Sequence, residues 1–180
     1  MIRAMTLLPF VMLLTACSTF VTPRYSISAD TNVALKALGV SGISVGLFGE
    51  PADFDRGCRL VGPLAPPDGM THAAYIKKAL EDELKVAGLH AATSPRVTLT
   101  GAVRKLAFSS SRGLTGGSWD IELTMYSSNG KSMTTSEHYE FESGYMAETA
   151  CKQTAEAFLP AAQNLIGKIV RAPAFRDLVQ

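Results

Sequence analysis

Residues 119–126 read Trp-Asp-Ile-Glu-Leu-Thr-Met-Tyr, and apolar and polar side chains alternate through this stretch without a break. Such alternation is typical of a β-strand, because successive side chains point to opposite faces of a sheet. The pair Asn129-Gly130 follows as a strong hairpin signal, and the alternation resumes over residues 133–141. We therefore predict an antiparallel sheet with one apolar, buried face and one polar face open to water.

Two segments upstream extend this sheet. Residues 43–47 alternate apolar and small side chains, which favours a strand. Residues 97–108 also alternate, but the pattern changes phase near Lys105. A β-bulge at that point accounts for the change, because one extra residue moves the following side chains to the other face.

Two further segments have the spacing of amphipathic helices. Residues 71–87 carry apolar side chains every three to four positions and are followed by Gly88, a favourable residue for a helix C-terminus. Residues 146–171 repeat this spacing around Pro160. Because proline lacks the amide hydrogen and clashes with the preceding turn, we expect a kink here or a division into two helices.

The predicted order of elements is β-α-β-β-β-α. The first strand and helix form a crossover to the second strand, and the remaining strands form a meander. Two helices on one face of the sheet bury all the apolar faces at once. The sequence thus predicts an α+β fold, with a four-stranded, mostly antiparallel sheet and two helices on one face.

The N-terminus carries a short apolar run over residues 5–14 that ends in Leu14-Thr15-Ala16-Cys17. A membrane-spanning helix needs ~20 apolar residues, whereas this run has the length of a signal-peptide core. The Leu-x-Ala-Cys pattern resembles the lipobox of bacterial lipoproteins, in which the cysteine is acylated and the signal removed. The alternative is an ordinary secretory signal with a chance cysteine at its end.

The lipobox resemblance divides the chain. It implies a lipoprotein signal peptide over residues 1–16 and a lipid anchor on Cys17, with palmitate-like chains holding the protein at a membrane. Residues 17–39 lack sustained periodicity, so we predict a tether there, followed by a single periplasmic α+β domain over residues 40–180. Ser18 replaces the aspartate that marks inner-membrane retention, which implies an outer-membrane location.

The net charge of the chain argues against two classes of partner. It has 17 Lys and Arg residues against 16 Asp and Glu residues, and Arg3 leaves with the signal. A balanced surface argues against nucleic acid, whose binding depends on a basic footprint. It also argues against polybasic attachment to anionic lipid. We therefore expect the membrane affinity to come from the acyl chains.

Cys58 and Cys151 remain once Cys17 carries lipid. In the oxidising periplasm an even pair of cysteines is most simply a structural disulfide, and we predict a Cys58–Cys151 bridge. The sequence contains no Cys-x-x-Cys spacing that would indicate a redox site.

Few residues are candidates for metal binding or catalysis. The three histidines, His72, His90 and His138, lack the short spacing of metal ligands. Acidic residues lie on neighbouring predicted strands: Asp120, Glu122, Glu137 and Glu140. Of these, Asp120, Glu122 and Glu140 can share a face and resemble a catalytic carboxylate pair, but an exposed sheet more often carries such residues as a solvated surface. We expect neither an enzyme nor a bound cofactor or metal.

Residues 107–118 are rich in Ser and Gly, which predicts a long connection between two strands. One interpretation is a flexible exposed loop. The other is a contact loop, because binding residues concentrate on loops that a rigid scaffold presents. In that case Phe108, Arg112 and Leu114 are the candidate partner-binding residues.

The lipobox, the element order and the terminal amphipathic helix together resemble the small outer-membrane lipoproteins of Gram-negative bacteria. These include the LPS-assembly lipoprotein, the auxiliary lipoproteins of ABC-type transport systems and uncharacterised members. The resemblance implies a non-catalytic accessory lipoprotein that docks on an outer-membrane or transport complex. The alternative is a stand-alone binder of lipid or glycan. Only Cys17 carries over as a functional residue.

Overall fold

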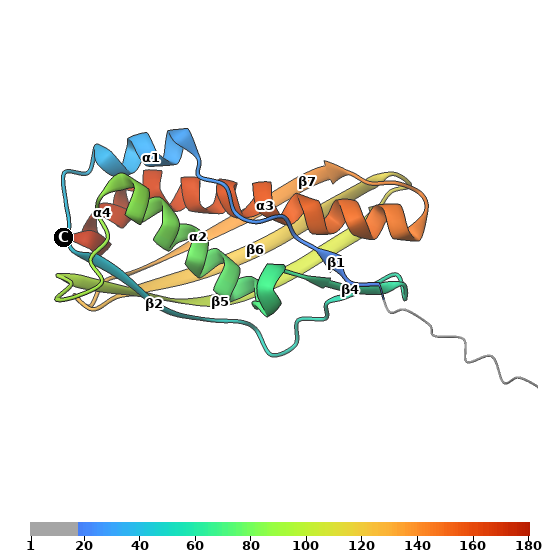
Figure 1. The fold of residues 1–180 in the computed structure, drawn as a ribbon, viewed down its shortest axis with the longest axis horizontal. Helices are drawn as coiled ribbons and strands as arrows, with labels where there is room; N and C mark the ends of the chain where they lie inside the picture. The colour runs from blue at the N-terminus through green and yellow to red at the C-terminus, as the bar shows by residue number, and fades with distance from the viewer. Residues whose placement is uncertain (1–17) are drawn as a thin grey trace, which may run out of the picture.

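The computed structural model describes residues 18–180, so the predicted signal peptide and Cys17 lie outside the described residues. A four-stranded sheet forms the centre of the molecule, with strand order β2-β5-β6-β7 (Figure 1). Its strands are β2 (Ile43–Gly49), β5 (Val97–Arg112), β6 (Gly116–Ser127) and β7 (Ser132–Glu142). Strands β5, β6 and β7 form the predicted antiparallel meander. Strand β2 runs parallel to β5, so the sheet is mixed.

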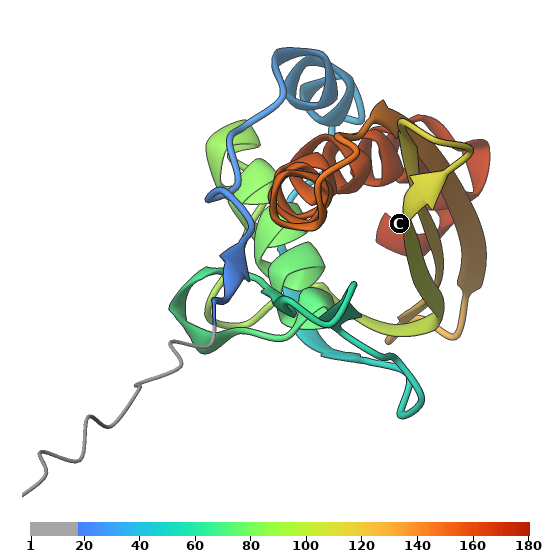
Figure 2. The same cartoon turned by 90° about the vertical axis from the view of Figure 1, so that its right-hand side faces the viewer.

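Helices α2 (His72–Ala87) and α3 (Ala147–Arg171) cover one face of this sheet (Figures 1 and 2). The apolar side chains of β6 predicted to face the core are all buried, as are those of the helices that meet them. Helix α2 begins at the Thr71 N-cap, whose side chain accepts a hydrogen bond from the Ala74 amide, and ends at Gly88 in the left-handed conformation. The predicted crossover from β2 through α2 to β5 is therefore confirmed.

Helix α3 runs through Pro160 without interruption, so the predicted division into two helices is wrong. Phe158, Ala161 and Ala162 around the proline are fully buried. Their packing against the sheet and the neighbouring helices holds this region helical despite the lost hydrogen bond. A final helix, α4 (Pro173–Val179), then turns back and buries Phe175 in the core.

The N-terminal segment corrects the prediction of a tether over residues 17–39. From Ser18 onward this segment is part of the folded domain. Strand β1 (Phe20–Val21) pairs with β4 (Gly62–Ala65), which in turn pairs with β3 (Gly57–Cys58) in a small second sheet. A short 3-10 helix (Pro67–Gly69) leads from β4 to α2. Helix α1 (Ala29–Lys36) packs against α2 and α3 and buries Leu35 completely.

A buried carboxylate fixes this segment to α2. The Glu83 side chain is 0% exposed, and its Oε1 accepts hydrogen bonds from the Tyr25 hydroxyl at 2.8 Å and the Ser28 amide at 2.7 Å. Burial and the hydrogen bond to Glu83 raise the pKa of Tyr25, so its hydroxyl stays a donor. Nearby, the Tyr75 hydroxyl donates to the Pro23 carbonyl at 2.9 Å. These bonds explain why a polar stretch without periodicity is ordered.

Residues 107–118, predicted to form a long loop, also differ from that prediction. Strand β5 continues to Arg112 and β6 starts at Gly116, so only residues 113–115 form the turn. The predicted bulge near Lys105 is confirmed by a register shift between Val103 and Lys105. Beyond it the backbone ladder between β5 and β6 continues despite the Ser- and Gly-rich sequence.

Replacing Glu83 tests how firmly the N-terminal segment is held. We expect Glu83→Ala to lower the free energy of unfolding by about 2–4 kcal/mol, because the buried Tyr25 hydroxyl and Ser28 amide both lose their acceptor. Glu83→Gln is the matched control, since its amide oxygen still accepts. Urea denaturation measures the change, and equal losses in the two variants would contradict this role of the acceptor.

Candidate functional site

The clearest candidate for a functional site is an edge of the central sheet that β5 leaves open. Strand β2 is short, and its last pairing with β5 joins Gly49 to Ala102. Strand β5 continues for ten residues beyond that point, to Arg112, paired with β6 on one side. In the part of the chain that the structure describes, no strand pairs with residues 103–112 on the other side. Such an edge offers unpaired backbone donors and acceptors.

A groove runs beside this edge. The loop that leaves β2 forms one wall and β5 forms the other, enclosing about 480 Å³. Its lining is Pro51, Asp53, Phe54, Asp55 and Gly57 from the loop, and Arg104, Lys105, Leu106, Ala107 and Phe108 from β5. Asp53 and Asp55 thus lie on one wall and Arg104 and Lys105 on the other. Arg104 donates to the Tyr126 hydroxyl, and Lys105 lies 3.7 Å from Asp120 on the polar face of the sheet. The groove is polar and open to solvent, as suits an extended peptide.

An aromatic contact fixes the loop wall in place. The Phe54 ring packs edge-on against Phe108 with the ring centroids 6.3 Å apart, and it lies 6.4 Å from Trp119. Trp119 is fully buried and donates its indole hydrogen to the Thr154 carbonyl of α3 at 2.8 Å. Phe54 therefore connects the loop to the core that α3 and β6 share.

His72 lies directly behind Phe54. Its side chain is 0% exposed, and its ring packs edge-on against Phe54 at 5.0 Å and Phe158 at 4.8 Å. Burial, with a smaller contribution from Arg56, lowers the pKa of His72 to about 3, although Glu50 Oε1 lies 3.4 Å from Nδ1. His72 is therefore neutral at neutral pH, and the aromatic rings separate it from the groove.

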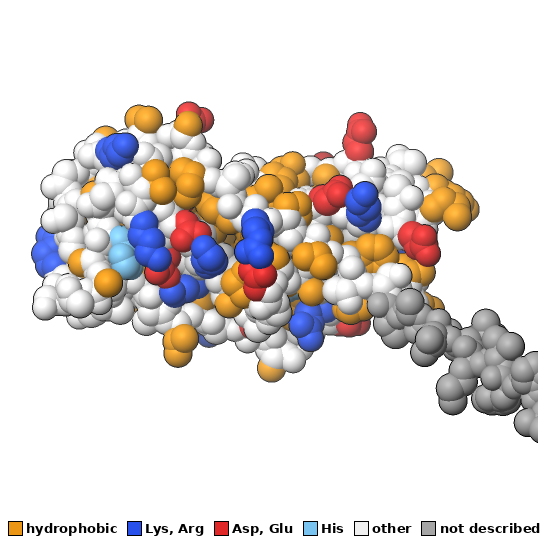
Figure 3. All heavy atoms as spheres, in the orientation of Figure 1, with side chains coloured by type: hydrophobic (Ala, Val, Ile, Leu, Met, Phe, Trp, Pro, Cys, Tyr) orange, Lys and Arg blue, Asp and Glu red, His pale blue; other side chains and the backbone are white. Residues whose placement is uncertain are grey.

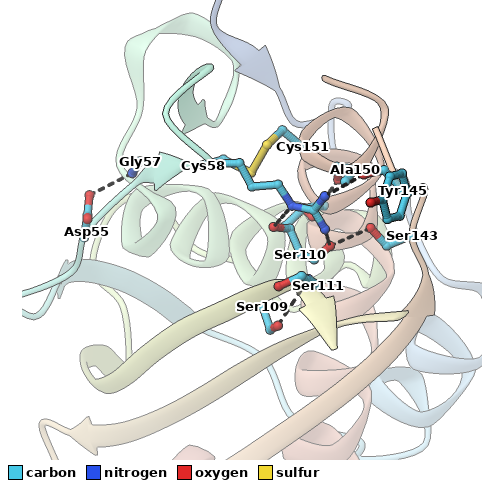
Figure 4. The surroundings of a disulfide bond; sticks show 12 residues. Asp55, Gly57, Cys58, Ser109, Ser110, Ser111, Ser143, Tyr145, Ala150 and Cys151 are labelled. Carbon is cyan, nitrogen blue, oxygen red and sulfur yellow. Dashed lines mark hydrogen bonds between the residues drawn. A yellow bond between two sulfur atoms is a disulfide. The ribbon is translucent and has the colours of Figure 1, made fainter. Parts of the chain in front are cut away.

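The predicted disulfide fixes the far end of the loop. The structure contains the Cys58–Cys151 bridge, with 5.8 Å between the two Cα atoms, and it joins β3 to α3 (Figure 4). The neighbouring Arg59 donates from Nε to the Ser110 hydroxyl and from Nη1 to the Tyr145 carbonyl, each at 3.0 Å. Phe54 and this cluster hold the groove open at both ends, so little ordering is needed for a segment to bind.

The polar face of the sheet carries a chain of ion pairs next to the groove. His138 Nδ1 lies 2.9 Å from Asp120, and its Nε2 lies 3.1 Å from Glu140. Lys105 lies 3.7 Å from Asp120, and Arg112 contacts Glu140. These side chains are one third to three fifths exposed. They form a solvated surface rather than an enclosed acid–base site.

The acidic residues do not all lie on that face. Glu122 is on it, with its carboxylate 3.5 Å from the Ser136 hydroxyl. Glu137 lies on the helix side, where it is almost fully buried and pairs with Lys168 of α3 at 2.6 Å. That ion pair connects β7 to α3.

The three predicted partner-binding residues lie in different places in the structure and do not form one contact surface. Phe108 is half-buried in β5 and packs on Trp119 with the ring centroids 5.1 Å apart. Arg112 is at the end of β5 in the ion pair with Glu140. Leu114 is exposed at the tip of the β5–β6 turn. The long connection predicted to present all three is absent, and Cys17 lies outside the described residues.

Local sequence patterns do not reveal the groove. Its loop wall, residues 50–57, is recognisable as a loop from its Gly, Pro and Asp content, but the partner strand is not. The sequence feature that does indicate an open edge is strand length, because the alternating pattern of residues 97–108 is longer than that of residues 43–47.

Within residues 18–180, the structure brings together no three His, Cys, Asp or Glu side chains suited to a metal ion. None of the helices in that range is long and apolar enough to span a membrane.

No protein-family model and no curated protein matches the sequence. One solved structure shows the same fold. A Xanthomonas campestris protein of the DUF330 family is similar with a TM-score of 0.57 and 13% identity, over 85% of this chain and 95% of that protein. A candidate lipoprotein from Caulobacter crescentus gives a TM-score of 0.41 and 13% identity, over 79% of this chain and 93% of that one.

The depressed pKa of His72 predicts a pH dependence of stability. The unfolded chain binds a proton at His72 below pH 6.5, whereas the folded protein does so only near pH 3. His72 therefore contributes stability that is fully present above pH 6.5 and is lost as the pH falls toward 3, at up to about 1.4 kcal/mol per pH unit.

His72→Phe, which keeps an aromatic ring in the cluster, isolates this contribution. Urea denaturation across this pH range should give a difference between wild type and variant that changes steadily with pH. Parallel curves for the two proteins would show that His72 is not buried in its neutral form.

Proposed function

We propose that this chain is a non-catalytic, lipid-anchored accessory lipoprotein of the bacterial cell envelope. In this proposal acyl chains on Cys17 hold it at the outer membrane, and its domain faces the periplasm. There it docks on an outer-membrane or transport protein by receiving an extended segment of that partner along the open edge of β5. The single observation that carries the proposal is the length of β5 beyond its pairing with β2.

The open edge supports a protein partner. Soluble proteins usually shorten, cover or charge their sheet edges, because a free edge pairs with other chains. Here residues 103–109 of the edge lie beside a groove of about 480 Å³, and Arg104 and Lys105 are the charged side chains on this stretch. Beyond it, Ser110 is already bonded to Arg59 and Ser143. An added strand gains main-chain hydrogen bonds from the edge and specificity from pockets for alternate side chains.

The charges in the groove support selection among such segments. Asp53 and Asp55 lie on the loop wall and Arg104 and Lys105 on β5, so a segment between them meets both signs of charge. A segment with charges of both signs in the matching order is favoured, and a uniformly charged one meets repulsion from one wall. Charge complementarity of this kind contributes more to specificity than to affinity.

The alternative function, a stand-alone binder of lipid or glycan, needs an enclosed site of suitable size. A partly enclosed hollow lies between the N-terminal segment and α2, lined by Arg24, Tyr25, Pro67, Met70, Tyr75, Lys78 and Asp82. Its volume is about 140 Å³. Ligand pockets usually have ~300–1,000 Å³, so the hollow is too small for a whole acyl chain or a sugar chain. The groove beside β5 is large enough at about 480 Å³, but it is polar and open to solvent instead of enclosed. We therefore favour the accessory role.

Photo-crosslinking in intact cells tests the docking edge. A benzoylphenylalanine at Arg104 lies beside the open edge, and one at Thr100 is the matched control, because it is exposed on the same strand where β2 covers the edge. We expect a discrete adduct with one envelope protein from Arg104 and little or none from Thr100.

Hydrogen exchange on the purified complex completes the test. The amides of residues 103–109 should exchange more slowly in the complex than in the free protein, because strand addition gives them acceptors. Equal adduct yields at both positions, or unchanged exchange over these residues, would contradict docking by strand addition.

A further inference from the structure

We propose that the end of the domain where the N-terminal chain emerges lies directly on the phospholipid surface. There Leu60, Leu114, Tyr145 and Met146 insert among the lipid headgroups and fix the orientation of the domain. This inference rests on the proposed lipidation of Cys17 and adds a second, non-covalent contact with the membrane.

The start of the described chain is held at this end. Phe20 pairs with Leu64 of β4. The carbonyl of Ser18 lies so close to Gly62 that a Cβ there would meet it at 1.7 Å, and Gly62 adopts a positive φ of 155°. Only Ser18 and Thr19 therefore separate Cys17 from β1. Two extended residues reach ~7 Å, so the acyl chains keep this end of the domain at the membrane surface.

Large apolar side chains project from the same end. Leu60 in the β3–β4 turn is fully exposed, and Leu114 at the β5–β6 turn is 77% exposed. Tyr145 and Met146, just before α3, are 76% and 69% exposed. Figure 3 shows apolar side chains gathered at this end, over the start of α3. Isolated exposed apolar residues are ordinary, but several at one end indicate an interaction site.

Hydrogen bonds show that the three turns are neighbours. Arg59, next to Leu60, donates to the Tyr145 carbonyl at 3.0 Å. The amide of Ser143 donates to the Thr115 carbonyl at 2.7 Å, which connects the start of the α3 loop to the turn that carries Leu114. Figure 4 shows Cys58, Ser110, Ser143 and Tyr145 grouped around the disulfide. The three turns thus form one surface.

The backbone conformation of Arg59 and Leu60 determines where the leucine side chain lies. Arg59 and Leu60 have φ values of 44° and 60°, in the left-handed region that non-glycine residues rarely adopt. They are the central residues of the β3–β4 hairpin turn, in which the Val61 amide donates to the Cys58 carbonyl at 3.0 Å, and such turns require this conformation at both positions. The turn therefore places the leucine side chain at the exposed tip of the hairpin.

The charges at this end favour a contact by apolar insertion over electrostatic attraction. Arg112 is paired with Glu140, and Arg59 is occupied by its bonds to Ser110 and Tyr145. Insertion of each apolar side chain contributes only a small free energy, but the acyl chains already hold the domain at the membrane surface. Tethering raises the effective concentration of the lipid, so weak contacts are populated.

Fluorescence quenching by brominated lipid tests the proposal in the full-length, lipidated protein. The protein is reconstituted into vesicles of phosphatidylethanolamine and phosphatidylglycerol, with and without bromine on the acyl chains. Leu114→Trp and Tyr145→Trp report on the proposed contact. Val86→Trp is the matched control, because Val86 is an exposed apolar residue near the C-terminus of α2, at the opposite end of the domain (Figure 1). Trp119 is buried and gives the same background in every variant.

We expect bromination to reduce the emission of Leu114→Trp and Tyr145→Trp and to leave that of Val86→Trp unchanged. Protein that floats with the vesicles but shows no quenching at either reporter overturns the membrane contact and leaves the lipidation intact. Protein that does not float overturns the lipidation, and with it the contact.

Discussion

The buried carboxylate of Glu83 joins the N-terminal segment to the rest of the domain. By accepting hydrogen bonds from the Tyr25 hydroxyl and the Ser28 amide, it makes the polar N-terminal segment part of the fold. A segment without its own apolar pattern is otherwise expected to stay disordered, since it buries too little surface to offset its lost entropy. With these bonds in place, the folded domain begins at β1, which only two residues separate from Cys17, the proposed site of lipidation.

The proposed docking edge follows from one difference in strand length. Strand β5 is longer than β2, which leaves an open edge for a partner strand. The loop that fills the space beside this edge is fixed by Phe54 at one end and by the Cys58–Cys151 disulfide at the other. The same disulfide joins β3 to α3 at the end of the domain where the chain emerges. One cross-link therefore supports both the proposed docking groove and the proposed membrane contact.

The sequence predicted those parts of the fold that local patterns determine. The alternation of residues 119–126, the bulge near Lys105 and the end of α2 at Gly88 all have short-range physical causes, and all appear in the structure. The disulfide followed from the number of cysteines. The candidate groove could not be predicted, because it depends on which strand ends first at a shared edge.

Where the structure differs from the predictions, contacts between residues distant in sequence are the cause. Residues 18–39 lack periodicity and therefore predict a tether, but their partners are Glu83 and other residues distant in sequence. The Ser and Gly content of residues 107–118 predicts a long loop, whereas pairing with β6 holds most of this backbone extended. At Pro160, packing of the surrounding residues outweighs a local preference against helix.

The most direct test of the central claim is hydrogen exchange of the backbone amides of residues 18–38 in the full-length, lipidated protein. If Glu83 makes this segment part of the domain, the amides of α1 and of Ser28 exchange slowly, as those of α2 do. Exchange at the rate of an unstructured peptide would show that the segment is a free tether, and the domain would then not be held at the membrane in a fixed orientation.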